Sequence, residues 1–285
     1  AMAVGADAVD SIAATGRLSG MYGLEGGHHI NNDTAKLDYF YGRGVRYMTL
    51  TWNNSTDWAT SASDETDPSK KLAHRGLTAF GTQVVRKMND LGMLVDISHV
   101  WEQTFRDVLA TTRKPVIASH SSVWNISPHR RNLKDWQLRA LKANGGVAFI
   151  NFAPWFIDST FGSREAAMKR KQGARIDSIQ AQIAGDEFIK EFYANEQLDA
   201  EYDAIRPSIG QVLDHFDYVA SLIGVDHVGI GSDFDGISVT PSGLEDVTKL
   251  PDLTLGLFER GYSEDDVRKI LGGNFIRVLR AAESR

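Results

Sequence analysis

The chain has 285 residues, a formal net charge of −6 and 42% hydrophobic residues, a composition typical of a globular protein with a substantial core. It contains no cysteine, which excludes disulfide scaffolds, cysteine nucleophiles and thiolate metal sites. The lack of a basic excess argues against a nucleic-acid-binding protein, and no apolar run reaches the roughly 20 residues of a membrane-spanning helix.

The first part of the chain alternates short apolar strands with amphipathic helices. The predicted elements are, in order, a helix over 7–15, a strand over 18–24, a helix over 34–41, a strand over 45–52, a helix over 80–91, a strand over 93–99, a helix over 102–111 and a strand over 115–120. The polar segment 53–70 predicts a long loop.

The second part of the chain continues the same alternation. A helix over 135–143, ended by Gly145 and Gly146, is followed by a strand over 147–152, a charged helical stretch over 163–204, a helix over 209–223 and a strand over 227–233. Two helices close the chain, the first with Ser263 as its N-cap.

Strands that alternate with helices predict parallel βαβ units, and both a doubly wound sheet and a (β/α)8 barrel satisfy that pattern. No glycine-rich phosphate-binding loop follows any of the six strands, which weakens the nucleotide-binding alternative. Four of the strands end on a metal-ligating or proton-transferring side chain: Glu25, His99, His120 and Asp233. In a barrel the carboxyl ends of all strands meet at one mouth, so these side chains would share a site.

These residue types suit a metal centre. Neutral imidazole is the commonest zinc ligand, so His99 and His120 are candidate ligands of one ion. The two oxygens of Glu25 suit a carboxylate that bridges two ions, and Asp233 suits proton transfer. On the pattern alone, histidines satisfied within the core or a loop are an equally good interpretation.

Five motifs, taken in order, are more specific. They are GLEGGH at 23–28, DISHV at 96–100, SHSS at 119–122, RRN at 130–132 and GIGSDFDG at 229–236. Together they resemble the membrane (renal-type) dipeptidase family, peptidase family M19, over the chain from about residue 20 onward. The interval of 21 residues between His99 and His120 is similar to that of the family.

The resemblance implies an α/β fold, a (β/α)8 TIM barrel of the metal-dependent amidohydrolase type, with two Zn²⁺ ions at its mouth. It implies that Glu25 bridges the two ions and that His99 and His120 bind the second. Dipeptides, including those with a C-terminal D-residue, would be hydrolysed by a metal-bridging hydroxide.

The resemblance also implies how the substrate is held. Arg131 matches the arginine that binds the free carboxylate of the dipeptide, a role that suits a bidentate guanidinium, and Asn132 is a weaker candidate for the same pocket. Asp233 matches the acid that handles the proton and the free amine of the substrate. Trp52 stands where the best-known members carry a histidine, and we expect it to line the wall of the substrate pocket.

One departure concerns the first metal site. The family places a His-x-Asp pair on its first strand, whereas the only such pair here, His215 and Asp217, falls inside the predicted helix over 209–223. We therefore expect residues 1–285 to form a single barrel domain that lacks its first two strands, which a further N-terminal segment of the polypeptide or another chain would supply. We also expect the charged segment 158–206 to be a helical insertion near the barrel mouth.

Two other interpretations stay open. The chain could be a non-catalytic or metal-deficient barrel fragment that only binds ligands, or an amidohydrolase that acts on another small amide, such as a lactam or a cyclic dipeptide. We expect small dipeptides as partners and no nucleic acid, while a homodimer and the cellular compartment are left open.

Overall fold

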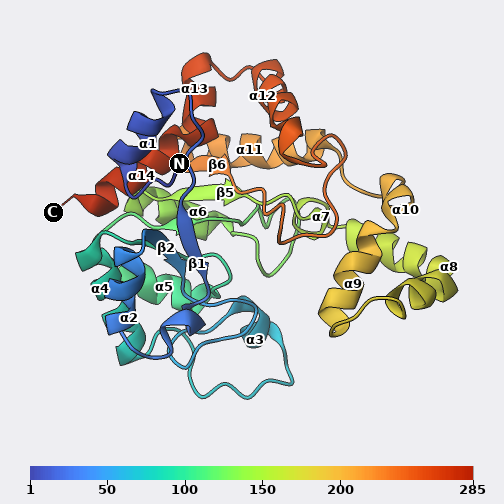
Figure 1. Cartoon of the computed structure of the whole chain (residues 1–285), viewed down its shortest axis with the longest axis horizontal. Helices are drawn as coiled ribbons and strands as arrows, with labels where there is room; N and C mark the ends of the chain where they lie inside the picture. The colour runs from blue at the N-terminus through green and yellow to red at the C-terminus, as the bar shows by residue number, and fades with distance from the viewer. Residues whose placement is uncertain (285) are drawn as a thin grey trace.

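The computed structural model describes residues 1–284, except for the side chain of Phe188. Its six parallel strands form one sheet (Figure 1). They are β1 (Tyr22–Glu25), β2 (Val45–Thr49), β3 (Leu94–Asp96), β4 (Ile117–Ala118), β5 (Val147–Ile150) and β6 (Val228–Ile230). Each strand pairs with the next one along the chain, from β1 to β6.

This strand order decides between the two predicted architectures. A doubly wound sheet reverses its strand order at a switch point, whereas a barrel adds each new strand on the same side. The order β1-β2-β3-β4-β5-β6 has no reversal, so the sheet follows the order of a (β/α) barrel. Within residues 1–284, β1 pairs only with β2 and β6 only with β5. The expectation of two preceding strands concerns chain outside these residues and stays a prediction.

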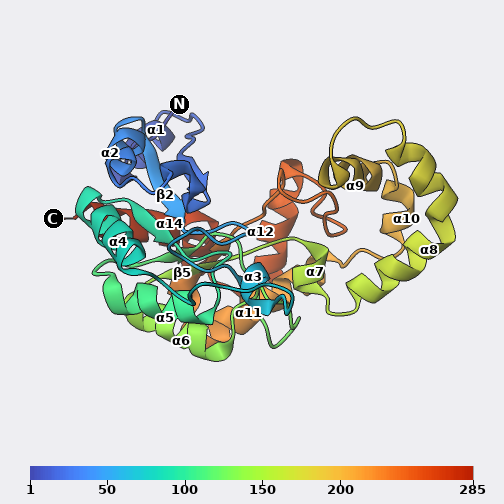
Figure 2. The same ribbon diagram turned by 90° about the horizontal axis from the view of Figure 1, so that it is seen from below.

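Helices surround the sheet (Figures 1 and 2). The longer ones are α1 (Ala6–Ala13), α2 (Ala35–Gly42), α4 (Ala79–Leu91), α5 (Glu102–Thr111), α6 (Asp135–Asn144), α8 (Phe161–Gln180), α9 (Glu187–Glu196), α11 (Ile209–Ile223), α12 (Leu250–Glu259) and α14 (Asn274–Glu283). The shorter ones are α3 (Ala62–Thr66), α7 (Pro154–Ile157), α10 (Asp199–Asp203) and α13 (Glu264–Arg268). No helix among residues 1–284 combines the length and apolarity needed to cross a bilayer.

Side chains alternate between the two faces of the sheet, as the period of a strand requires. Leu94 and Ile117 pack in one buried cluster with Leu279 of α14. The next residues along the strands, Val95 and Ala118, belong to the larger core that includes the outer helices. Because of this alternation, the position of each polar residue along its strand determines the face of the sheet to which its side chain points.

The charged stretch predicted over 163–204 forms α8, α9 and α10, which lie at one end of the molecule in both ribbon views (Figures 1 and 2). Phe161 and Tyr202 stack within a small separate core. Glu165 accepts hydrogen bonds from Tyr202 and from the indole of Trp155 on α7. The helices are therefore tied to α7, and their placement near the barrel mouth stays a prediction.

Several local predictions are confirmed and others are wrong. Ser263 caps α13 by accepting from the backbone of Asp266, and Gly145 ends α6 in the left-handed region at φ 80°. β2 to β6 end two to three residues earlier than predicted because the last residues of each predicted strand leave the sheet, whereas β1 begins later than predicted and includes Glu25. The segment predicted as a loop over 53–70 contains α3, capped by Ser61.

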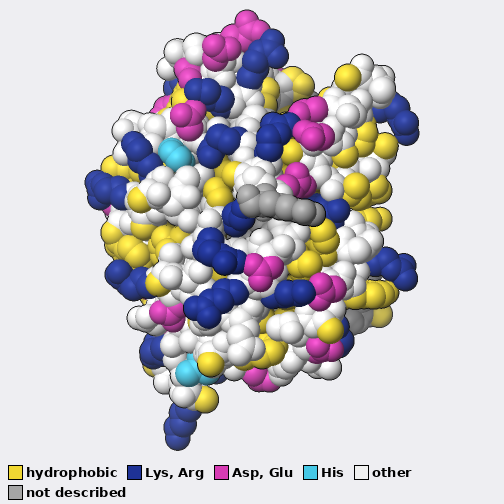
Figure 3. Space-filling model, turned by 90° about the vertical axis from the view of Figure 1, so that its left-hand side faces the viewer, with side chains coloured by type: hydrophobic (Ala, Val, Ile, Leu, Met, Phe, Trp, Pro, Cys, Tyr) yellow, Lys and Arg dark blue, Asp and Glu magenta, His cyan; other side chains and the backbone are white. Residues whose placement is uncertain are grey.

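On the side shown in Figure 3, acidic and basic side chains are interspersed.

Candidate metal centre

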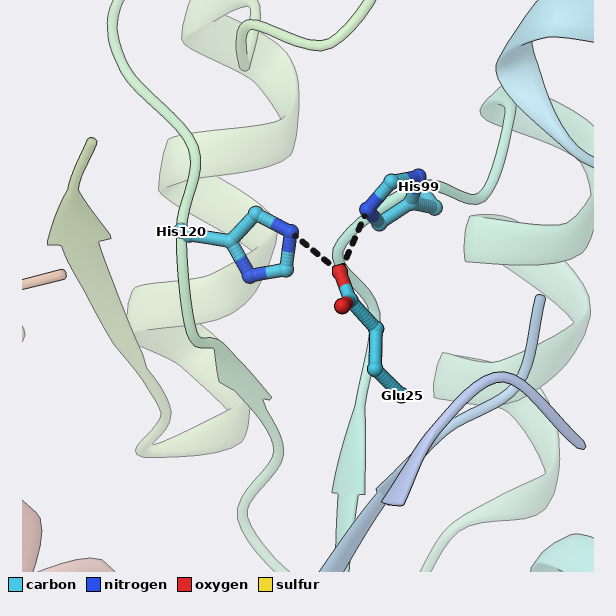
Figure 4. Close-up of side chains that lie close together, drawn as sticks. All are labelled: Glu25, His99 and His120. Carbon is cyan, nitrogen blue, oxygen red and sulfur yellow. Dashed lines mark hydrogen bonds and ion pairs between the residues drawn. The ribbon is translucent and has the colours of Figure 1, made fainter. Parts of the chain in front are cut away.

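Glu25, His99 and His120 come together at the carboxyl ends of β1, β3 and β4. The Nε2 atoms of His99 and His120 lie 2.9 and 3.2 Å from the same oxygen, Oε1 of Glu25, and both rings point at it (Figure 4). The two rings meet edge to face with centroids 4.9 Å apart. Among the residues that the structure describes, this is the group of three whose ligand atoms could surround one metal ion.

Backbone geometry places two of the candidate site residues. His99 follows β3 by three residues and has a φ of 68°, and Asp233 follows β6 by three residues with a φ of 64°. Such positive values cost free energy in residues other than glycine and tend to occur at functional sites. The sequence pattern predicts both residues on their strands, whereas each lies in the turn that leaves the sheet.

The electrostatics of the group suit metal binding. Burial and the nearby Arg131 hold the pKa of His99 well below its ordinary value, so its ring is neutral, as a metal ligand must be. The rings of His120 and His99 beside Glu25 lower the pKa of this residue, which keeps its carboxylate ionised.

The donor set fits a divalent metal that prefers nitrogen and oxygen ligands. Nε2 of His120 is buried and makes no hydrogen bond to any described residue, so this nitrogen gains a partner when an ion is bound. Half of the Glu25 side chain stays exposed, and the dashed lines in Figure 4 reach only one of its two oxygens. The three residues together supply an incomplete ligand shell with room for further ligands.

Arg131 is a cation whose hydrogen-bonding groups are largely unused. Its Nε atom is buried without a hydrogen-bond partner, and Nη2 reaches only the backbone oxygen of His120, at 3.5 Å. Its guanidinium lies 5.4 Å from the ring centroid of Phe156. Burial lowers the pKa of Arg131 to about 10, so the group stays charged at neutral pH, and it has no anionic partner in hydrogen-bond contact among residues 1–284.

Asn132 and Trp52 lie in different environments. Asn132 is buried, and its amide donates to the backbone oxygens of Ser127 and Phe156 while accepting from Ser122. These bonds fix the loop that carries Arg131, and the predicted substrate contact of Asn132 stays a prediction. Trp52 is 38% exposed, with its ring 6.5 Å from that of His99, which places it beside the group of ligands.

Asp233 shares a cleft with Glu25. This cleft of about 890 Å³ is lined by Glu25, by Asp233 and its neighbours to Gly236, and by the segment 245–247. Asn151, which follows β5, donates a hydrogen bond of 2.9 Å to Oδ2 of Asp233. Burial raises the pKa of Asp233, which makes this carboxylate a better proton acceptor than an exposed one.

Sequence reasoning missed Asn151 and the polar group formed by Asp96 and Ser119 behind His120. Each of these residues lies at the carboxyl end of a buried strand, and that position was the available signal. The single His-x-Asp pair of the sequence, His215 and Asp217, does not form a metal site. His215 is buried inside α11, where it accepts from the backbone of Val123 and bonds to the oxygen of Ile157. Asp217 bonds to Arg260 and Tyr262 instead.

Comparisons with known proteins agree with this geometry. Residues 1–285 match the family described as membrane dipeptidase, peptidase family M19. An uncharacterized dipeptidase of Schizosaccharomyces pombe is 36% identical over 97% of this chain and 56% of its own length. The dipeptidase tcpJ of Claviceps purpurea is 35% identical over 99% of this chain and 55% of its own length. The chain thus spans about half the length of these relatives.

Solved structures resemble the fold over 99% of the chain. The probable dipeptidase PvdM of Pseudomonas aeruginosa has a TM-score of 0.80 at 26% identity, with 74% of its chain covered. A metallopeptidase of Rhodobacter sphaeroides, solved with a phosphinate mimic of the dipeptide L-Ala-D-Ala, has a TM-score of 0.76 at 28% identity, with 68% of its chain covered.

Proposed function

Because the chain belongs to the membrane dipeptidase family, peptidase family M19, we propose that it acts as a metal-dependent dipeptidase. The observation that carries the proposal is the meeting of His99 and His120 on one oxygen of Glu25, at 2.9 and 3.2 Å. The family implies a metal, and these three residues would hold it.

We propose Zn²⁺ as the metal, with two ions at the complete site. Imidazole nitrogens and a carboxylate oxygen are ligands that zinc accepts readily. The second oxygen of Glu25, which neither histidine contacts, supports a bridging role, because one carboxylate can bind two ions at once. The ligands of the other ion would come from chain that precedes β1 in a complete barrel. When bound, the metal lowers the pKa of water and polarises the scissile carbonyl.

The protein's own residues supply substrate binding and proton transfer. Arg131 offers an unpaired guanidinium that suits the free carboxylate of a dipeptide, since a planar fork binds a carboxylate with two hydrogen bonds. Asp233 would accept the proton of the attacking water and pass it to the leaving amine, and Asn151 holds it in place. Trp52 would form an apolar wall beside the scissile bond, and Asn132 would hold the Arg131 loop.

The charge layout favours a substrate as short as a dipeptide. Arg131 supplies a positive group near the ligands, and the acidic cleft that contains Asp233 supplies a negative one. A zwitterionic dipeptide carries complementary charges at its two ends, so both ends would be held at once. A preference for a C-terminal D-residue is part of the proposal and follows the L-Ala-D-Ala mimic bound in the Rhodobacter structure.

A second candidate function is hydrolysis of another small amide by the same centre. The unpaired guanidinium of Arg131 speaks against it, because a lactam or cyclic dipeptide has no free carboxylate to neutralise that charge. Under this alternative, substrates with and without a carboxylate would be cleaved at similar rates.

The experiment measures hydrolysis of L-Ala-D-Ala and L-Ala-L-Ala by the full polypeptide, depleted of metal by a chelator and then titrated with Zn²⁺. We expect no activity without metal and activity that rises to a plateau near two ions per chain. A His99→Ala variant serves as the matched control for metal dependence. Zinc-loaded protein that cleaves neither dipeptide would refute the proposal.

A further inference from the structure

A buried hydrogen-bond network lies behind His120. Asp96, at the end of β3, is fully buried, and its carboxylate accepts four hydrogen bonds. Oδ1 accepts from the backbone nitrogens of Ser98 and Ser119 at 2.9 and 3.0 Å. Oδ2 accepts from the hydroxyls of Thr49 and Ser119 at 2.6 and 2.5 Å. Asp96 therefore links three adjacent strands just below the candidate metal centre.

The register of the sheet explains why these residues meet. Thr49 pairs with Asp96 across β2 and β3, and Asp96 pairs with Ile117 across β3 and β4. Ser119 lies two residues beyond Ile117, so it has the same parity and points to the same face. Three polar side chains thus occupy the inward-facing positions at the carboxyl end of the sheet, where their neighbours below are apolar.

The network determines the direction of each hydrogen bond. An ionised carboxylate only accepts, so the single hydroxyl proton of Ser119 must point to Asp96. Oγ of Ser119 also lies 2.8 Å from Nδ1 of His120. With its own proton committed to Asp96, Ser119 can only accept there, so the ring nitrogen that donates is Nδ1. A neutral imidazole has one N–H, which leaves Nε2 as a lone pair directed toward Glu25.

We propose that Asp96 and Ser119 are positioning residues that keep the proton of the neutral His120 ring on Nδ1 and so leave Nε2 free to bind the metal. The inference rests on the proposed metal centre and adds the device that selects the ligating atom. A hydrogen bond to the other ring nitrogen generally fixes the tautomer and orientation of a metal-binding histidine. Here the carboxylate acts through a serine hydroxyl.

His99 has no comparable hydrogen bond, so the network of Asp96 and Ser119 acts on His120 alone. Nδ1 of His99 is buried and makes no hydrogen bond to any described residue, and its ring is placed by a backbone with a φ of 68°. The two candidate ligands are therefore held by different means. His99 is placed by its backbone conformation, and His120 is oriented by its hydrogen bond to Ser119.

Asp96→Asn tests the inference because it reverses the direction of the hydrogen bond between residue 96 and Ser119 while it preserves the shape of the side chain. Oδ1 of Asp96 faces two backbone N–H groups, which cannot accept, so the amide nitrogen introduced by the substitution must take the place of Oδ2. It then donates to Ser119, whose own proton turns to Nδ1 of His120 and forces the ring proton onto Nε2. Thr49→Val is the matched control, because it removes a hydrogen bond of the same carboxylate without touching the Ser119–His120 contact.

Two readouts are measured on the full chain. The first is the tautomer of His120 in metal-free protein, from two-bond ¹⁵N–¹H spectra at about pH 8.5, well above the ordinary titration range of imidazole. The second is the affinity for Zn²⁺, from competition with a chromophoric chelator. We expect an Nδ1–H ring in the wild type and Thr49→Val, an Nε2–H ring in Asp96→Asn, and a loss of affinity in Asp96→Asn of roughly 10- to 100-fold.

The outcomes separate this inference from the proposed function. An Nε2–H ring in the wild type, or unchanged Zn²⁺ affinity in Asp96→Asn, would overturn the inference. If the wild type binds no Zn²⁺, the proposed function fails and the tautomer alone decides the inference. If Asp96→Asn does not fold, Ser119→Ala replaces it, with loss of affinity expected and with rescue by Ser119→Thr, which keeps the hydroxyl.

Discussion

Replacing Arg131 by methionine should weaken substrate binding and stabilise the fold at the same time. The guanidinium is held in a partly buried position with its Nε unpaired, and burial lowers its pKa from 12.5 to about 10. That shift corresponds to about 3 kcal/mol against the charged form, taken as an upper bound. Methionine keeps the contact with Phe156 and removes the charge, so we expect the free energy of unfolding to rise by about 1–3 kcal/mol.

The same substitution removes the proposed partner of the substrate carboxylate. Loss of one member of a desolvated charge pair costs about 2–5 kcal/mol, or roughly 30- to 5,000-fold in kcat/KM. The assay is a double-mutant cycle in which wild type and Arg131→Met each hydrolyse a dipeptide and its C-terminal amide. The wild type should lose activity on the amide, and the variant should treat both substrates alike.

The cycle has clear refuting results. If Arg131→Met slows hydrolysis of the dipeptide and of its amide equally, Arg131 does not bind the carboxylate. If the variant is less stable in urea unfolding, the guanidinium has a counter-ion that the structure does not show. Metal content is measured in each protein, because Arg131 lies close to His99 and His120.

Three further predictions concern other residues. Asp233→Asn should lower kcat by about 10²–10⁴ with unchanged metal content, because the amide cannot accept the proton; steady-state kinetics and metal analysis check it. Trp52→His should lower kcat/KM about tenfold on the preferred dipeptides, through loss of an apolar wall. His215, with its pKa lowered to about 4 by burial, binds its proton first in the unfolded chain. Stability is therefore full above about pH 6.5 and falls toward pH 4, and His215→Gln should remove about 2 kcal/mol of the loss between pH 7 and 5 in urea unfolding.

Each of these predictions has its own control. Asparagine tolerates a positive φ, so Asp233→Asn should keep the wild-type circular dichroism spectrum. An unfolded variant would contradict the expectation that asparagine fits the backbone conformation of Asp233. Faster turnover of Trp52→His on every dipeptide would contradict the proposal that Trp52 forms an apolar wall of the substrate pocket. Equal pH dependence in wild type and His215→Gln would show that His215 is accessible to protons in the folded state.

The sequence predicted the strands and the chemistry of their ends because both are local patterns. Apolar runs identify strands, and the polar residues that follow identify the mouth of the site. The sheet order, however, depends on which strands pair, and pairing is not encoded in the period of any single strand. The strand and helix pattern alone therefore left the barrel and the doubly wound sheet open, the family resemblance favoured the barrel, and the consecutive pairing from β1 to β6 agrees with it.

The network of Asp96 and Ser119 was beyond sequence reasoning for a different reason. Parity along the strands places both residues on the inward face, but it does not say that their atoms meet at 2.5 Å. That distance depends on the register between neighbouring strands and on the turn that carries Ser119. The hydrogen bonds of Asn132 were equally out of reach: its position next to Arg131 suggested a substrate contact, which stays a prediction, but gave no sign that its amide donates to the backbone of Ser127 and Phe156.

The strand order has a mechanical consequence for catalysis. Glu25 ends β1 and Asp233 follows β6, so the proposed bridging ligand and the proposed proton acceptor belong to the two outermost strands of the six. Five strand-to-strand contacts separate them, and each contributes its own twist. Small changes in the twist between neighbouring strands add up along this series, so the distance between Glu25 and Asp233 depends on the curvature of the whole sheet. Core substitutions far from any ligand would then change the rate by widening or narrowing the mouth.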